Sequence, residues 1–186
     1  MAGSDPAVGE LRPRRAVRPG ARPRPRNPVD HTHKDDRPMT PDTFSERYNP
    51  AIAQTMIELG NAMPGLAQYL GIELVEFGPG TLLARAQLGE NLLTPSGNVH
   101  GGVLAGIMDH ITGAVIYPLM PDGHWGATTE LKLNYIAPVQ AGTVDAHASV
   151  LAMTKRSAVV RGELQVQDRL VCAGQGTITI VAPRTP

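Results

Sequence analysis

The feature that most constrains the fold is an apolar run over residues 101–117, which lies between segments of alternating polarity. Drawn as a helix at about 100° per residue, the run gathers its large side chains on one face. These are Leu104, Ile107, Met108, Ile111 and Val115. An apolar stripe of this kind must be buried against a second layer, and the flanking segments predict that this layer is a sheet.

The flanking segments alternate between apolar and polar residues, as half-buried strands do. IELVEF at 72–77 and TLLARAQL at 81–88 enclose the turn GPG and predict a hairpin. Beyond the apolar run, the same period continues in Leu131, Leu133 and Tyr135. Three more strands are expected, at about 143–153, 157–166 and 170–181. This order of elements predicts an α+β fold in which a long helix packs on an antiparallel sheet.

The first 41 residues differ in composition from the rest of the chain. They hold eight of the seventeen prolines and only scattered apolar residues, so we expect a disordered tail. Residues 1–38 carry nine Lys/Arg against five Asp/Glu, whereas the remaining residues carry eight against twelve. A basic arm for nucleic acid is one interpretation of the tail. A non-functional extension is favoured, because the tail lacks aromatic side chains on which bases could stack.

Two further regions follow the tail. Residues 42–70 form an expected N-terminal helical segment, which includes a helix with Ile52, Met56 and Leu59 on one face and an end near Gly60. Residues 71–182 form the expected main domain.

Several classes of protein are disfavoured by composition and motif. The formal net charge is zero, which gives no signature of a nucleic-acid or membrane binder. We find no run of about eighteen apolar residues and no secretory signal, and the single cysteine fits a reducing compartment, so a cytoplasmic location is expected. The histidines show no metal-ligand spacing and no GxSxG motif occurs, so neither a metal site nor a serine hydrolase is expected.

A carboxylate, Asp109, interrupts the apolar run. On the helical wheel it lies away from the large side chains and is flanked by small residues, namely Ala105, Gly106, Thr112 and Gly113. Position alone favours a solvent-facing acid, but a stripe of small residues indicates that a partner chain or a ligand approaches the helix. His110 is turned about 100° away, so an Asp–His dyad is not implied.

The helix is expected to begin at His100–Gly102. Two glycines let a bound group approach the backbone, and the first N–H groups of a helix are free donors that suit a developing oxyanion. His100 either adds a hydrogen bond or holds the loop, and the second role is favoured. Together with Asp109, these groups suit acyl transfer in which the acid attacks directly or activates water.

The distance between these groups indicates a shared site. Asp109 lies nine residues beyond His100, which corresponds to about 13 Å along a helix. In a two-fold dimer with antiparallel helices, Asp109 of one chain would meet the Gly-Gly turn of the other. We therefore expect an obligate homodimer at least.

At this point the sequence resembles the hotdog-fold acyl-CoA thioesterases of the PaaI-like (phenylacetate-pathway) group. The resemblance spans residues 63–181 and rests on three elements: the HGG of 100–102, the acid nine residues after that histidine, and GATTELKLNYIAPVQAG at 126–142. It implies a long helix wrapped by a curved sheet, a dimer that often forms a tetramer, and hydrolysis of acyl-CoA to free acid and CoA without a cofactor.

The resemblance also implies roles for residues. Asp109 is the expected nucleophile or general base, the Gly101–Gly102 backbone polarises the thioester carbonyl, and Thr128 helps to position water or the acid. The remaining residues expected to bind substrate or coenzyme A are Thr94, Asn98, Thr129, Asn134, Lys155 and Arg156. Many relatives carry an asparagine where this chain has Thr94. Lys155 and Arg156 are candidates for the phosphates of coenzyme A because cations are scarce in the folded part.

Two other functions compete with hydrolysis. A hotdog dehydratase or hydratase would share the fold but should pair a histidine with an acid across the site. A non-catalytic regulator would bind acyl-CoA without turnover, and its contact with nucleic acid would need a reading helix that the tail does not offer.

Overall fold

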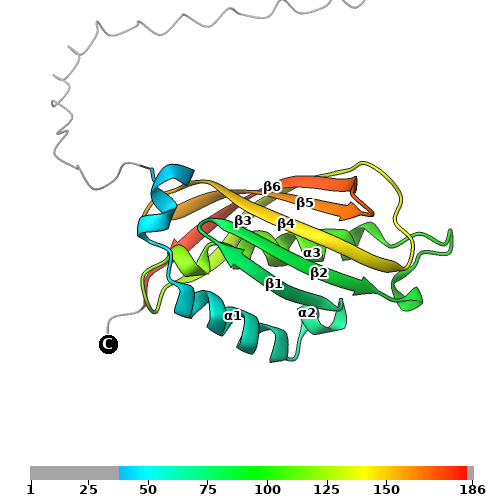
Figure 1. Cartoon of the computed structure of the whole chain (residues 1–186). Coiled ribbons are helices and arrows are strands. Elements are labelled where there is room, and N and C mark those ends of the chain that lie inside the picture. Colours follow the sequence, from blue (N-terminus) through cyan, green and yellow to red (C-terminus); the bar gives the residue numbers. More distant parts are fainter. Residues whose placement is uncertain (1–37, 184–186) are drawn as a thin grey trace, which may run out of the picture. The chain divides into compact units, whose positions relative to one another are not determined.

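The computed structural model describes residues 38–183, which fall within one compact unit. A six-stranded antiparallel sheet curves around one long helix, as Figure 1 shows. The strands are β1 (Ile72–Gly78), β2 (Thr81–Leu88), β3 (Trp125–Tyr135), β4 (Gly142–Met153), β5 (Ser157–Val166) and β6 (Arg169–Val181). Their order across the sheet is β1-β2-β4-β5-β6-β3, so β1 and β3 are the two edges. The predicted α+β fold is confirmed.

The central helix α3 (Gly101–Ala114) buries the face that the sequence predicts. Leu104, Ile107, Met108 and Ile111 are each at most 3% exposed. They pack on the inner face of the sheet, where the alternate residues of β2, β4 and β5 are also buried. The apolar residues that repeat every 3.6 positions in the helix and every two positions in the strands therefore form one core.

A glycine in β5 lets α3 lie close to the sheet. A Cβ atom at Gly162 would overlap the sulfur of Met108 and lie 3.2 Å from Cγ2 of Thr112. Both of those side chains are fully buried, so neither can move into solvent. Gly162 itself faces Gly174 of β6 in the register. The closest approach of helix and sheet thus rests on a strand position without a side chain.

The N-terminal segment closes one side of the sheet. It comprises η1 (Pro41–Glu46), α1 (Pro50–Ala62) and α2 (Leu66–Tyr69). The Asn49 side chain caps α1 by accepting from the amides of Ala51 and Ile52. At the other end, the Asn61 amide donates to the Leu74 carbonyl at 2.9 Å and accepts from its N–H at 2.8 Å. The carboxamide thereby binds the edge of β1 as another strand would.

Two sequence-based boundaries need correction. Met39 pairs with Met153 through two backbone hydrogen bonds of 2.7 and 3.2 Å, so the last residues of the predicted tail belong to the fold. Residues 1–37 lie outside the described part of the chain. Helix α1 continues through Gly60 to Ala62, and the short helix η1 was not expected. Pro64 still limits α1, because a proline disfavours helical backbone before it.

The segment Gly101–Leu119 is long and apolar enough to cross a membrane by length and composition, with a mean hydropathy of 1.3. The expectation that no such run exists was therefore wrong. However, 61% of the window is buried inside the protein. The sheet accounts for these apolar side chains, as it does for the core helix of any globular α+β fold.

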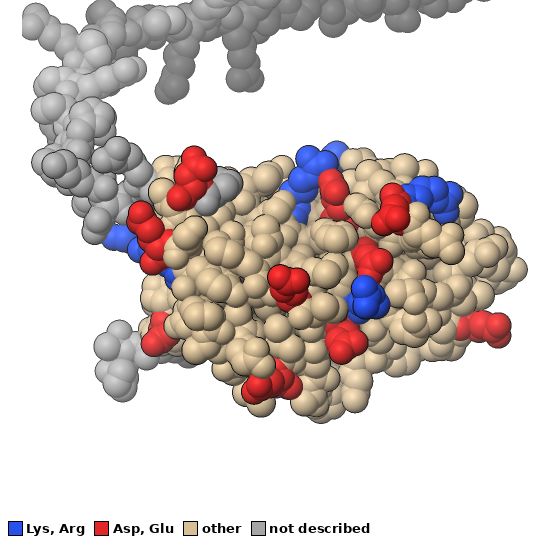
Figure 2. All heavy atoms as spheres, in the orientation of Figure 1, with Lys and Arg blue, Asp and Glu red and all other residues tan. Residues whose placement is uncertain are grey.

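The charged side chains are scattered over the face shown in Figure 2. Acidic groups lie among wide uncharged areas, and lysines and arginines form no continuous basic surface on this face. Two of the described arginines are paired: Arg85 binds Asp145 at 2.9 Å, and Arg161 binds Glu163 at 2.5 Å. The described surface on this side thus lacks the basic stripe of a nucleic-acid binder.

The contact of Met108 with Gly162 of β5 predicts what a methyl group added at Gly162 would do. Gly162→Ala should lower the free energy of unfolding by about 1–3 kcal/mol, because the methyl overpacks a fully buried site. Urea unfolding measures this cost. In a Met108→Ala background the same change should cost much less, since the shortened side chain leaves room. Equal costs in the two backgrounds would show that another contact is responsible.

Candidate active site

A pocket of about 520 Å³ lies between α1, α3 and β3, and Asp109 lines it. Met56 and Leu59 of α1, with Met63 directly after the helix, form its apolar wall. Thr128 of β3 and His110 of α3 also line it. Asp109 is exposed to solvent in the single chain. The pocket therefore places one carboxylate at an opening whose remaining walls are mainly uncharged.

The polar groups of this pocket divide into two sets. The Thr55 hydroxyl donates to the Ala51 carbonyl at 2.9 Å, and the Tyr117 hydroxyl accepts from the Gly126 amide at 3.5 Å. By contrast, Asp109, His110 and Thr128 make no side-chain hydrogen bond to any residue between 38 and 183. A group without an internal partner can bind a ligand without first breaking a bond. These three side chains are thus the polar groups that remain available.

His110 was missed as a site residue by the sequence analysis. The helical wheel separates it from Asp109 by about 100°, yet the pocket is wide enough for both side chains to line it. The only sequence signal for His110 was that it directly follows Asp109. Burial lowers the pKa of His110, and the nearby Asp109 carboxylate opposes part of that shift. The imidazole is therefore neutral at neutral pH.

The start of α3 lies in different surroundings. His100 is the N-cap residue, and its Nδ1 accepts from the Gly102 amide at 2.9 Å. The Gly101 amide has no acceptor among the residues that the structure describes. Tyr135 covers this turn, and its hydroxyl donates to the Gly101 carbonyl at 3.1 Å. Of the two predicted donors, Gly101 is therefore free, whereas Gly102 is held by the histidine ring.

Tyr135 continues the alternating positions of Leu131 and Leu133 on β3, and such a position predicts a buried side chain. The Tyr135 side chain is instead 55% exposed. β3 is an edge strand, so no neighbouring strand of this chain covers its outer side.

One chain does not bring the acid and the helix start together. Asp109 lines the pocket beside α1, whereas His100 and Gly102 line a separate hollow beside α2. Gly101 faces a third hollow, next to Tyr135. Asp109 and the start of α3 are thus separated in one chain, as the nine-residue spacing predicts.

The stripe of small residues around Asp109 is only partly as expected. Thr112 is fully buried on the sheet side, where its hydroxyl donates to the Met108 carbonyl at 2.9 Å. Gly106 is approached by Leu70, whose Cδ1 would lie 2.9 Å from an added Cβ. The group that comes close at Gly106 is therefore the residue that follows α2 of the same chain. Gly113 lines the pocket, as the stripe predicts.

Four of the other predicted binding residues lie outside the Asp109 pocket. A bulge at Thr128–Glu130 turns Thr129 away, and its hydroxyl donates to the Thr177 carbonyl at 3.1 Å. Asn134 is exposed on β3. The Thr94 amide and hydroxyl donate to the Asn98 carbonyl at 2.7 and 3.0 Å, which closes the loop before α3. Asn98 lines a polar hollow near the helix start.

Lys155 and Arg156 are exposed in the turn between β4 and β5. The Arg156 carbonyl accepts from the Ile180 amide at 2.8 Å, and Ile180 pairs with Gly126 across β6 and β3. The turn therefore lies at the end of the sheet where β3 begins, away from the helix start. The structure does not place these cations with Gly101.

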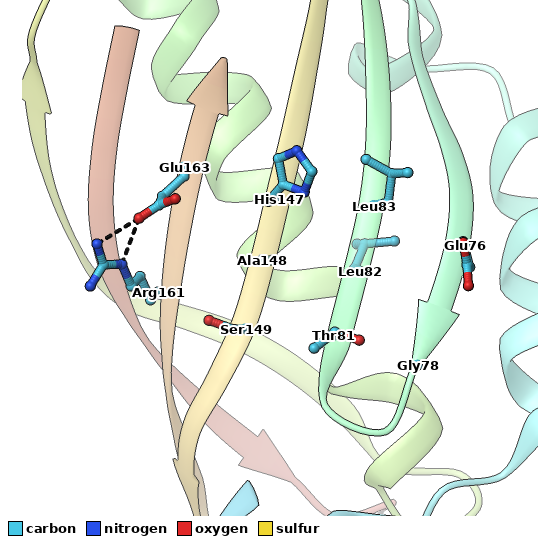
Figure 3. Close-up of a pocket in the computed structure, with 10 residues that line it drawn as sticks. All are labelled: Glu76, Gly78, Thr81, Leu82, Leu83, His147, Ala148, Ser149, Arg161 and Glu163. Atoms are coloured by element: carbon cyan, nitrogen blue, oxygen red, sulfur yellow. Dashed lines mark hydrogen bonds and ion pairs between the residues drawn. The ribbon is translucent and has the colours of Figure 1, made fainter. Parts of the chain in front are cut away.

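A further hollow, of about 380 Å³, lies on the outer face of the sheet. Figure 3 shows His147, Ser149 and the Arg161–Glu163 ion pair in front of the strands, with α3 behind them. Arg161 is already neutralised by Glu163, and the sheet separates the hollow from Asp109. The outer face is therefore not the candidate active site.

Comparisons with known proteins identify the family and the fold. Residues 96–173 match the family described as the thioesterase superfamily. The 1,4-dihydroxy-2-naphthoyl-CoA hydrolase of Listeria monocytogenes is 27% identical over 123 residues, which cover 64% of this chain and 98% of that protein.

Solved structures show the same relationship. A conserved protein of Pseudomonas aeruginosa is 31% identical with a TM-score of 0.63, and the match covers 67% of this chain and 99% of the other. A phenylacetic acid degradation-related protein of Ralstonia eutropha is 27% identical with a TM-score of 0.61, covering 63% and 90%. The chain therefore belongs to the thioesterase superfamily, shares the hotdog fold of its PaaI-like members, and is a thioester hydrolase.

Proposed function

We propose that the protein hydrolyses acyl-CoA thioesters, with Asp109 as the catalytic carboxylate. The observation that carries the proposal is a pocket that Asp109 and Thr128 both line, each without an internal hydrogen-bond partner among the described residues. Asp109 is the one charged side chain among the residues that line this pocket. With His110 neutral, the carboxylate is the natural base.

The reaction needs few groups. Water adds to the thioester carbonyl carbon while its proton passes to Asp109. The carbon–sulfur bond then breaks, and the proton goes to the leaving sulfur, which gives a free acid and CoA. Direct attack by Asp109 is the alternative, and it would form an anhydride that water then opens. Thr128 lies where its hydroxyl can orient the water or the acid.

The carbonyl oxygen is proposed to bind at the start of α3. The Gly101 N–H is free to donate to a developing oxyanion, and the positive end of the helix dipole adds to its effect. The Gly102 N–H becomes a second donor if the exposed His100 ring turns away.

A dimer would bring the two halves of the site together. β3 is an edge strand, and the residues at its two ends are exposed and apolar, with Trp125 at 51% and Ile136 at 54%. Pairing of β3 with its copy would cover these groups and remove an unpaired edge. Under a two-fold axis, Asp109 of one chain can then serve the helix start of the other.

The acyl group is proposed to be medium-chain or aromatic. The pocket has a volume suited to a small organic group, and methionine and leucine side chains form its α1 wall. Methionine adapts readily to ligands of different shape. Similarity to a 1,4-dihydroxy-2-naphthoyl-CoA hydrolase supports an aromatic acyl group.

Loss of the carboxylate should abolish turnover. Asp109→Asn is expected to lower kcat by about 10²–10⁴, because the amide cannot accept a proton. Release of CoA thiol from a panel of acyl-CoAs measures the rate, and the single cysteine of the protein, Cys172, is buried and adds little background. Asp122→Asn, in an exposed turn, should keep the wild-type rate. An Asp109→Asn variant that retains most of its activity would disprove the role of the acid.

Removal of the Gly101 donor should also be costly. Gly101→Pro deletes this N–H at the first helical position, where proline is well tolerated, and His100 already has an extended backbone with ψ of 136°. We expect kcat to fall by about 10²–10³. Gly101→Ala keeps the donor and meets only ordinary contacts with Tyr135, so it should remain active. If kcat falls by similar factors in both variants, the rate depends on the shape of the turn at residue 101 and not on its N–H donor.

Mixing the two inactive proteins tests whether the site is shared. Asp109→Asn and Gly101→Pro chains, unfolded and refolded together, should form mixed dimers that each have one intact site. About a quarter of the wild-type sites should then be restored. If each chain uses its own acid and its own helix start, no activity returns.

Because His110 is neutral in the folded protein, we expect it to cause part of the loss of folding stability at acidic pH. Its folded pKa lies below the unfolded value, so the unfolded chain binds the proton first as the pH falls below about 6.5. The neutral His110 therefore lowers the free energy of unfolding by nothing above that pH, whereas below that pH its preference for the proton in the unfolded chain destabilises the fold. His110→Gln should lose less stability than the wild type between pH 7.5 and 5.5, measured by urea unfolding. Equal losses in both proteins would contradict a buried, neutral imidazole.

A further inference from the structure

Among the backbone N–H groups of residues 99–103, only that of Gly101 lacks an acceptor within residues 38–183. The four neighbouring amides all donate to acceptors of this chain, and they belong to Val99, His100, Gly102 and Val103. Gly101 is the first residue of α3, where the helix itself offers its N–H no acceptor. The proposed oxyanion donor is therefore the one amide of this turn that a ligand can use without competition.

A free donor on a glycine has to be held in place by its surroundings. Glycine has no Cβ atom, so its backbone adopts a wider range of φ and ψ than that of other residues. A donor stabilises a developing oxyanion most when it already points at the oxyanion before the reaction. The contacts that restrict Gly101 therefore decide how effective its N–H is.

Besides the bonds within the helix, two hydrogen bonds tie the backbone around Gly101 to distant parts of the chain. On one side, the His100 amide donates to the Leu92 carbonyl at 3.0 Å. On the other side, the Gly101 carbonyl accepts from the Tyr135 hydroxyl at 3.1 Å. The φ and ψ rotations of Gly101 lie between these two bonds, so both rotations are restricted. The free N–H thereby keeps one orientation.

Tyr135 is suited to hold this carbonyl because the sheet fixes its backbone. It is the last residue of β3 and pairs with the buried Cys172 of β6. The next amide, that of Ile136, donates to the Val171 carbonyl at 2.8 Å. The phenol ring lies against the glycine, since a Cβ atom added at Gly101 would be 3.4 Å from its Cζ. Although the side chain is 55% exposed, its backbone and its hydroxyl thus both have fixed partners.

We propose that Tyr135 is a positioning residue for the proposed acyl-CoA hydrolysis, on which this inference rests. Its hydroxyl holds the Gly101 carbonyl, and the N–H of the same residue is thereby kept oriented toward the thioester carbonyl. Tyr135 itself touches no reacting atom in this arrangement. It acts through the backbone of the glycine, so its effect should appear in the transition state and not in the binding of the substrate.

Removal of the hydroxyl tests this role. Tyr135→Phe keeps the ring and should lower kcat about tenfold with little change in KM, because the donor is still present but no longer held. This loss is smaller than the one expected for Gly101→Pro, in which the donor is absent. Tyr48→Phe is the matched control: it removes the same kind of bond, from a hydroxyl to the Phe77 carbonyl at 2.8 Å, and should leave kcat unchanged.

A second substitution tests whether the hydroxyl acts through the glycine. Gly101 is not among the glycines with positive φ, so alanine can adopt its backbone, and alanine has fewer conformations to choose from. Gly101→Ala should therefore restore most of the lost kcat in the Tyr135→Phe background. A hydroxyl that contacts the substrate directly cannot be replaced by a methyl group on another residue.

Three kinetic results would overturn the proposal. An unchanged kcat in Tyr135→Phe would mean that the bond to Gly101 has no role in the reaction. A rise in KM at constant kcat would make the hydroxyl a contact for the bound substrate. A double variant that recovers no activity would show that the hydroxyl does not work by restricting the glycine.

The order parameter of the Gly101 N–H, measured by nitrogen-15 NMR relaxation, separates this inference from the proposed function. It should be near the rigid value of about 0.85 in the wild type, lower in Tyr135→Phe, and restored in the double variant with Gly101→Ala. If these changes occur but the wild type cleaves no thioester, the proposed function fails and Tyr135 still orders the amide. If the wild type cleaves acyl-CoA and Tyr135→Phe leaves the order parameter unchanged, the positioning role fails alone.

Discussion

The contact between α3 and the concave face of the sheet is the constraint on which the rest of the structure depends. Met108 and Thr112 lie directly on β5 because Gly162 offers no side chain beneath them. Because the large side chains of α3 are buried in this contact, the opposite face of the helix points away from the sheet. That face carries Asp109. Burial of the apolar stripe thus positions the carboxylate, although the carboxylate itself takes no part in the packing.

The same packing separates the two halves of the proposed site along one helix. The free amide of Gly101 lies where α3 begins, and Asp109 lies in the third turn, beside α1 and β3. Because a helix is rigid, one chain cannot bend the two groups toward each other. In the proposed dimer, the exposed edge of β3 would pair with its copy, and each chain would supply one half of the other's site.

Much of the fold could be predicted from the period of the apolar residues alone. Alternation located the strands, and the helical stripe identified the buried face of α3, because both patterns depend on backbone geometry that neighbouring residues share. Tyr135 and Thr112 show where this reasoning stops. An alternating position predicts a buried side chain only if another layer covers it, and a small residue faces solvent only if its angle on the helix allows it.

The sequence by itself determined the fold class and the position of the central helix, and it indicated Asp109 and His100–Gly102 as site candidates, because each depends on local spacing or on a short motif. Only the tertiary structure decided which groups share a pocket. It placed His110 in the same pocket as Asp109, turned Thr129 away from that pocket through a bulge, and placed Lys155 and Arg156 of the chain away from its own helix start. These relations join residues far apart in the chain, and they depend on strand register and loop paths that no local pattern encodes.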